Sequence, residues 1–130
     1  MEISKLKENL KQGFNNSPNK FISRLFEVRD NAHVEHLKTR SFAAHSALNG
    51  FYDDILDQAD NFIESYQGKH GLATIDIVKT TYTDFLSYLT EYVKYVEKSR
   101  SMFEDEFLKN QVDEIAKTCY STIYKLTFLK

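Results

Sequence analysis

The chain has 130 residues, and its 17 basic and 19 acidic side chains leave a formal charge of −2. Four glycines and one proline are too few for an all-β fold, which needs frequent turns. The near-neutral charge gives no global argument for nucleic-acid binding, and the single cysteine, Cys119, excludes a disulfide framework and a zinc ribbon. No apolar run is long enough for a transmembrane helix and the N-terminus lacks a signal-peptide core, so we expect a soluble cytoplasmic protein.

Residues 1–16 are predicted to form an N-terminal arm or a short helix, separate from a domain over residues 17–130. Apolar residues recur in the arm on one helical face: Ile3, Leu6 and Leu10. The lysines between them are candidate contacts to DNA phosphates, although Glu2 and Glu8 dilute their charge.

Two long helices are predicted in the first half of the domain. Ser17-Pro18 is a typical helix start, and the first helix, over about 18–39, has a recurring stripe: Ile22, Phe26, Arg29, His33, Leu37 and Arg40. Thr39 or Ser41 is expected to cap the second helix, over about 41–67, and Gly68 to end it. Its apolar stripe comprises Leu48, Tyr52, Ile55, Ala59, Phe62 and Tyr66.

Two further helices are predicted in the second half. The third helix, over about 74–98, carries Val78, Tyr82, Phe85, Leu89, Tyr92 and Val96 at helical spacing. Ser101 and Glu104 match a capping box for a final helix, with a break near 104–108, and Cys119 falls on its apolar face as a buried, inert thiol. Four long helices with short connections predict an all-α fold, a four-helix bundle.

Acidity concentrates on the second helix. Residues 41–76 carry six acidic side chains and one basic one, whereas residues 1–40 carry five acidic and eight basic ones. A polar stripe follows one line of this helix: His45, Asn49, Asp53, Asp60 and Glu64. One interpretation is a solvated acidic face. The other is a metal site, because iron, zinc and manganese sites combine imidazole and carboxylate ligands, and His33 and His36 of the first helix would add imidazoles.

Distance determines how such a site could be built. His45 and Asp60 are fifteen residues apart, so they lie about 22 Å apart along the helix and cannot bind one ion within one chain. An antiparallel pairing of this helix with its copy in a second chain would bring His45 against Asp60 and Glu64 of the partner and create two equivalent sites. The small residues Ala43, Ala47 and Gly50 fit either that subunit contact or a close contact within one bundle.

The residues of this polar stripe and the segment before it resemble those of a known protein family. The run from His36 to His45 (HLKTRSFAAH), followed by Leu48, Phe51-Tyr52, Asp60, Glu64 and Gly68, resembles the ferritin-like miniferritins of the Dps type. It is more similar still to short ferritin-like proteins of bacteriophage genomes, and a weaker similarity covers residues 112–129. The resemblance implies a ferritin-like four-helix bundle, in the cytoplasm of the bacterial host if the chain is phage-encoded.

The resemblance also implies an iron site shared between two chains, with Fe(II) oxidised by peroxide or dioxygen inside a dodecameric shell. Its ligand pattern falls on His33 or His36, then His45, Asn49, Asp60 and Glu64; the motif favours His36, and ungapped spacing favours His33. Two departures oppose oxidase activity, because Asn49 stands at an acidic position and Leu37 at an aromatic one. The alternatives are a non-enzymatic interaction or structural protein that keeps this fold without metal chemistry, and a DNA-compacting shell.

Overall fold

A computed structural model of the chain describes residues 16–130, which form an all-α structure with no strand in that range. Its elements are α2 (Pro18–Lys38), α3 (Phe42–His70), α4 (Phe85–Ser99), the 3₁₀ turn η1 (Arg100–Met102) and α5 (Glu106–Phe128). The predicted all-α class is therefore confirmed. The predicted N-terminal arm lies, but for Asn16, outside the described residues. No helix within residues 16–130 is both long and apolar enough to cross a bilayer.

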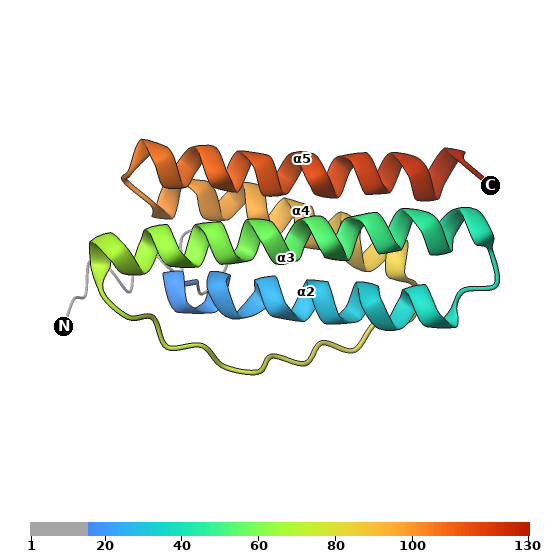
Figure 1. Cartoon of the computed structure of the whole chain (residues 1–130), viewed down its shortest axis with the longest axis horizontal. Coiled ribbons are helices and arrows are strands. Elements are labelled where there is room, and N and C mark those ends of the chain that lie inside the picture. Colours follow the sequence, from blue (N-terminus) through green and yellow to red (C-terminus); the bar gives the residue numbers. More distant parts are fainter. Residues whose placement is uncertain (1–15) are drawn as a thin grey trace.

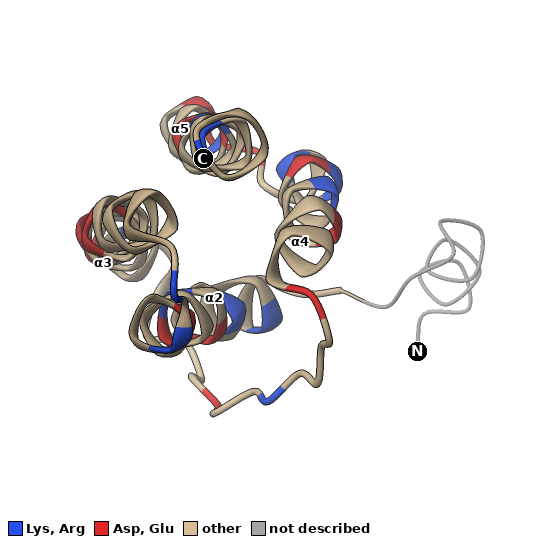
Figure 2. Cartoon of the chain, turned by 90° about the vertical axis from the view of Figure 1, so that its right-hand side faces the viewer, with Lys and Arg blue, Asp and Glu red and all other residues tan. Residues whose placement is uncertain are grey.

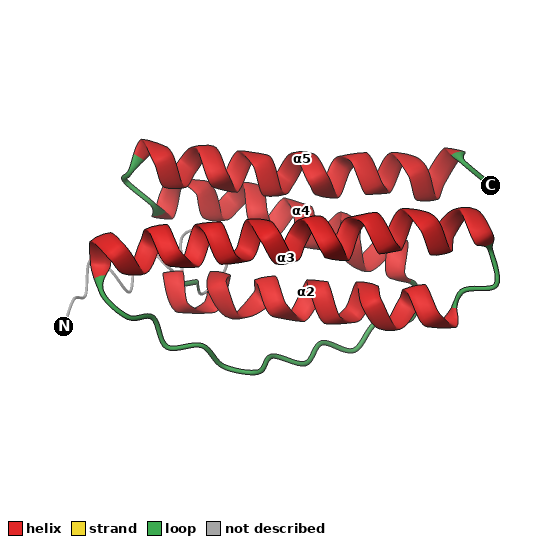
Figure 3. Ribbon diagram, viewed as in Figure 1, coloured by secondary structure: helices red, strands yellow, loops and turns green. Residues whose placement is uncertain are grey.

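The four helices pack side by side around one core (Figures 1 and 2). The helices α2 and α3 form an antiparallel hairpin, and α4 and α5 form a second one. An extended segment over residues 71–84, which we call the crossover, runs the length of the bundle beside α2, so α3 and α4 point in the same direction (Figure 3). Viewed along the bundle, α2 neighbours α3 and α4, and α5 closes the ring opposite α2.

The starts of α2 and α3 follow the predicted capping chemistry. The Ser17 hydroxyl accepts a hydrogen bond from Lys20 N at 3.1 Å, and the Ser41 hydroxyl accepts one from Ala44 N at 3.2 Å. The predicted end of α3 at Gly68 is wrong. The helix continues to His70 and ends at Gly71, whose φ of 91° is a backbone conformation that glycine adopts without strain.

The apolar stripe predicted for α3 is confirmed, but the stripe predicted for α2 has the wrong phase. On α3, the core contains Leu48, Ile55 and Phe62. On α2, Leu37 is 71% exposed, and the core residues are instead Phe21, Ile22, Leu25, Val28 and Ala32. Two neighbouring apolar lines on α2 differ by one residue. Packing against α3 and α4 selects between these lines, which spacing alone does not distinguish.

The core is rich in aromatic rings, and it encloses the single cysteine. Phe21, Phe62 and Phe103 meet with ring centroids 5.2–5.4 Å apart, which joins α2 and α3 to the segment before α5. Cys119 is fully buried, as predicted, and burial raises the pKa of its thiol to about 12. A thiol with so high a pKa carries little thiolate at neutral pH and is unreactive.

The predicted third helix starts eleven residues too early. Residues 74–84 belong to the crossover, and α4 begins at Phe85 after Asp84, whose carboxylate accepts hydrogen bonds from the backbone and hydroxyl of Ser87. The crossover is rich in β-branched residues, which lower helix propensity, although Val78 and Tyr82 continue the helical spacing of α4.

The predicted capping box before the last helix does not form. Residues 100–102 make a 3₁₀ turn, and α5 starts at Glu106 after Asp105. The Asp105 carboxylate binds Lys69 and His70 at the end of α3 instead of capping α5. This contact ties the end of α3, from which the crossover departs, to the start of α5.

Candidate metal centre

The turn between α2 and α3 brings two of the predicted histidines into direct contact. His36 lies in the last turn of α2 and His45 in the first turn of α3, with only residues 39–41 between the helices. Their rings stack with centroids 3.7 Å apart and planes 22° apart. Each ring also bonds the other residue's backbone: His36 Nδ1 lies 2.8 Å from His45 O, and His45 Nδ1 lies 2.9 Å from His36 O.

These two hydrogen bonds determine which ring nitrogens carry protons. A carbonyl oxygen only accepts, so both Nδ1 atoms donate and each neutral ring keeps its lone pair on Nε2. Neither Nε2 has a hydrogen-bond partner within residues 16–130. A metal-binding histidine characteristically donates its other N–H to a carbonyl or carboxylate, which orients the ring. The pair is therefore oriented in a way that is compatible with metal ligation through Nε2.

His33 and Asn49 join the same cluster through Tyr52. The His33 ring stacks on Tyr52 at 4.3 Å between centroids and lies 6.1 Å from His36. The Tyr52 hydroxyl donates to Asn49 Oδ1 at 2.8 Å. Both histidines that the sequence left open as ligands on α2 thus lie at this end of the bundle, His36 buried and His33 half-buried.

The predicted acidic ligands lie elsewhere. Asp60 and Glu64 are exposed farther along α3, and neither forms a hydrogen bond or ion pair with a residue of the described range. The acidic positions of α3 face away from the other helices (Figure 2). Within residues 16–130, no three His, Cys, Asp or Glu side chains are close enough together to hold a metal. One chain therefore assembles the histidines without the carboxylates.

Within the small-residue strip of α3, Ala47 is buried in this bundle, but Gly50 does not serve a close contact inside it. Gly50 is exposed, and a Cβ atom built at this position would meet no described atom within 4 Å. Of the two explanations for a glycine inside this helix, the structure removes the intrachain one and leaves the subunit contact to be tested.

A second polar cluster, which sequence reasoning missed, surrounds Glu27 on α2. The Tyr88 hydroxyl donates to Glu27 Oε1 at 2.7 Å, and Arg24 Nη2 lies 3.3 Å from the same oxygen. Burial, helped by the Glu27 carboxylate, raises the pKa of Tyr88. Arg24 in turn lies over the ring of Tyr95, 4.2 Å from its centroid. In the sequence, Arg24 and Glu27 form an ordinary surface pair, because the elements that bury them, α4 and the crossover, are remote in the chain.

A family model described as a family of unknown function, DUF5856, matches residues 36–126. The chain belongs to the DUF5856 family. The DUF5856 match includes His36, His45, Asn49, Asp60 and Glu64, and it begins after His33. No curated protein and no solved structure matches the chain significantly.

Proposed function

We propose that this chain is a ferritin-like, Dps-type protein that binds iron at a site completed by a second copy of the chain. The connectivity supports this proposal, because two antiparallel helix hairpins joined by one long crossover are typical of ferritin-like bundles. The resemblance around His36 and His45 supports the same fold.

The His36–His45 pair carries the metal part of the proposal. Two imidazoles from different helices are oriented by reciprocal bonds to backbone carbonyls, with both Nε2 lone pairs unused by the described residues. Any two hydrogen-bonding side chains could brace the turn, whereas neutral imidazoles that donate through Nδ1 leave Nε2 available to a divalent metal. Imidazole and carboxylate together suit ferrous iron.

The carboxylates are proposed to come from the partner chain. Asp60 and Glu64 are exposed about 22 Å or more from His45 along α3, and have no partners within residues 16–130. An antiparallel contact between two α3 helices, centred at about residues 53–54 and including Gly50, would set each pair of acids opposite the other chain's histidines. It would give two equivalent sites by two-fold symmetry.

Iron is the substrate in this proposal. Fe(II) bound by imidazole and carboxylate would pass electrons to peroxide or dioxygen, and the carboxylates would stabilise the ferric product. A dodecameric shell and iron storage follow only from the resemblance. Retention of DNA by a shell is a weaker extension of the same proposal, since the lysines that would contact phosphate belong to residues 1–16.

Asn49 and Leu37 favour a second candidate function. Asn49 is a neutral carboxamide whose oxygen already accepts from Tyr52, and Leu37 is 71% exposed where the resemblance implies an aromatic residue. Both features fit a non-enzymatic interaction or structural protein that keeps the bundle and lacks oxidation chemistry.

Native mass spectrometry with anaerobic Fe(II) tests the proposal. We expect a dimer, or a multiple of it, that takes up iron in fixed proportion to chains. His45→Ala should abolish uptake, and the matched control His70→Ala, which removes an exposed histidine at the other end of α3, should not. Iron uptake by a monomer, or equal uptake by the His45→Ala variant, would contradict a shared site.

A variant at Gly50 tests the subunit contact separately. A Cβ atom at Gly50 meets no described atom within 4 Å, and Gly50→Leu replaces glycine inside a helix, so it should raise monomer stability by up to about 1 kcal/mol. If α3 forms the dimer, the added side chain should lower the mass measured by light scattering and abolish iron uptake together. An unchanged mass would show that the subunit interface does not include Gly50.

A further inference from the structure

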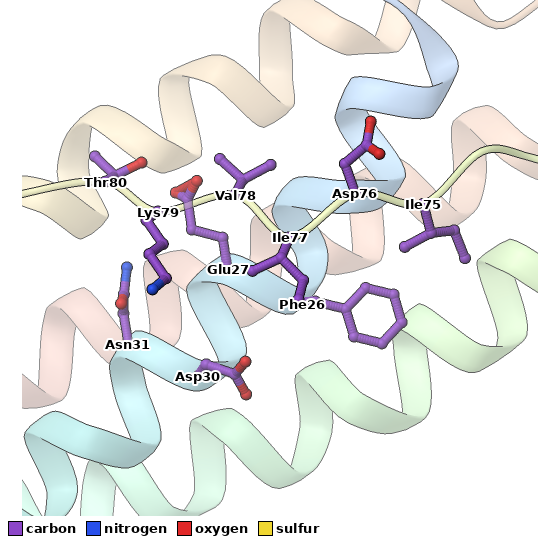
Figure 4. A pocket seen from close by; sticks show the side chains of 10 residues that line it. All are labelled: Phe26, Glu27, Asp30, Asn31, Ile75, Asp76, Ile77, Val78, Lys79 and Thr80. Atoms are coloured by element: carbon purple, nitrogen blue, oxygen red, sulfur yellow. The ribbon is translucent and has the colours of Figure 1, made fainter.

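A pocket of about 610 Å³ separates α2 from the crossover (Figure 4). Its volume lies in the range of sites for small molecules. One wall comes from α2 and the opposite wall from residues 75–80 of the crossover. The lining combines apolar side chains with three carboxylates and one lysine: Phe26, Glu27, Asp30, Asn31, Ile75, Asp76, Ile77, Val78, Lys79 and Thr80.

Glu27 is the unusual member of this lining, because its carboxylate is buried and only half satisfied. Its side chain is 1% exposed. Oε1 takes the bonds from Tyr88 and Arg24, whereas Oε2 is buried and has no hydrogen-bond partner within residues 16–130. Leaving such an oxygen without a donor is costly, and native proteins rarely do so.

The charges around the pocket select the kind of molecule that could supply the missing donor. A carboxylate oxygen only accepts hydrogen bonds, so the ligand must donate. Asp76 adds a carboxylate with no ion pair among the described residues, and Asp30 adds one that pairs with Arg29 at 3.1 Å; Lys79 is the one lysine of the lining. Lys79 is exposed and forms no ion pair with described residues, so its ammonium can move aside when another cation enters.

We infer that this pocket binds a small organic cation, an alkylammonium compound whose ammonium group donates to Glu27 Oε2. Its aliphatic part lies against the apolar side chains of the lining, which are Phe26, Ile75, Ile77 and Val78. The acids at Asp30 and Asp76 attract the cation to the mouth. The entering ammonium takes the space beside Glu27 that the side chains of Val78 and Lys79 border in Figure 4. The site is separate from the histidine cluster and does not depend on iron.

Isothermal titration of the full chain with hexylamine, against hexanoate of the same length, tests this inference. We expect the amine to bind and hexanoate not to bind. Glu27→Gln should weaken amine binding roughly tenfold or more, since it removes the charge from the hydrogen-bonded oxygen. The matched control is Asp57→Asn, which removes an exposed carboxylate of α3 outside the pocket and should leave binding unchanged.

Lys79→Ala provides a test that does not touch the buried cluster, so it remains informative if Glu27→Gln fails to fold. Removal of the competing lysine should tighten binding of hexylamine several-fold. Preferential binding of hexanoate would overturn the inference, as would weaker amine binding in Lys79→Ala. Absence of amine binding to the unaltered chain would also overturn the inference. An enclosed water would then be the donor to Glu27 Oε2.

Discussion

Two connections lie against α2, and they are held to the bundle in contrasting ways. At the C-terminal end of α2, a turn of three residues leads to α3, and the His36–His45 pair closes this turn with side-chain bonds to backbone carbonyls. Along its other side runs the crossover, fourteen residues without regular structure, whose backbone is held by side chains that reach out from α2 and α3. The turn is stabilised by residues next to it in sequence. The crossover is stabilised mainly by residues of α2, which are far from it in sequence.

The bonds to the crossover show how sparse its attachment is. Ala73 N donates to Gln67 Oε1 and Thr74 N to Asn19 Oδ1, both at 3.1 Å, while Asp76 N donates to Ser23 Oγ at 2.9 Å. Leu72 and Ile77 are 90% and 92% exposed. Near its end, Tyr82 donates to Glu35, and burial together with this carboxylate raises the pKa of Tyr82 to about 12. The crossover is thus held by a few separate hydrogen bonds, and it contributes few buried side chains to the core.

The largest effect is expected on the crossover side, from the loss of Glu27. Glu27→Ala leaves the buried Tyr88 hydroxyl without its acceptor and Arg24 without its counter-charge, so we expect a loss of about 3 kcal/mol in unfolding free energy. Urea denaturation followed by circular dichroism measures it. Asp57→Ala is the surface control, and a loss for Glu27→Ala as small as this control's would show that the cluster contributes no stability.

A smaller effect is expected at the short turn. His36→Ala removes a buried ring and leaves His45 O without its donor, which should cost about 2 kcal/mol. Because the two histidines share both bonds and the stacking contact, the double variant with His45→Ala should lose less than the sum of the single variants by about 1 kcal/mol. Strict additivity in the same denaturation assay would mean that the rings act independently.

Loss of one hydrogen bond that holds the crossover should lower the unfolding free energy by less than either variant above. Ser23→Ala deletes the acceptor for Asp76 N, and since Asp76 is exposed, water can replace it at a cost of about 0.5–1 kcal/mol. Hydrogen exchange should detect the change first, as faster exchange confined to residues around Asp76. Faster exchange throughout α2 would show that the crossover and the bundle open as one unit instead.

The smallest effect concerns pH at the end of α3. Lys69 and His70 hold the pKa of Asp105 below its usual range. Because the folded pKa is the lower one, this stabilisation is fully present above the unfolded value, near 4, and is lost as pH falls through the folded value. Asp105→Asn should therefore flatten the acid side of the curve of urea midpoint against pH. An identical slope in Asp105→Asn and in Asp57→Asn would exclude this contribution.

The same contrast explains how much of the fold and site the sequence predicts. Ser17, Ser41 and the apolar line of α3 act through neighbours within one or two turns, so local pattern predicts them. The predicted start of α4 is wrong because Val78 and Tyr82 have helical spacing, although the chain stays extended there to span the bundle. The histidine cluster follows from a short turn, whereas the burial of Glu27 depends on α4 and the crossover, which local pattern cannot bring to it.

The crossover also affects how the chain folds. Each hairpin pairs helices that are adjacent in sequence, so α2 with α3, and α4 with α5, can associate by closing short loops, which is fast. Contacts between the hairpins require closure of the longer segment, whose entropic cost rises only slowly with length. We therefore expect the two hairpins to form early and to dock late, with the sparsely attached crossover as the last part to become ordered and the first to open.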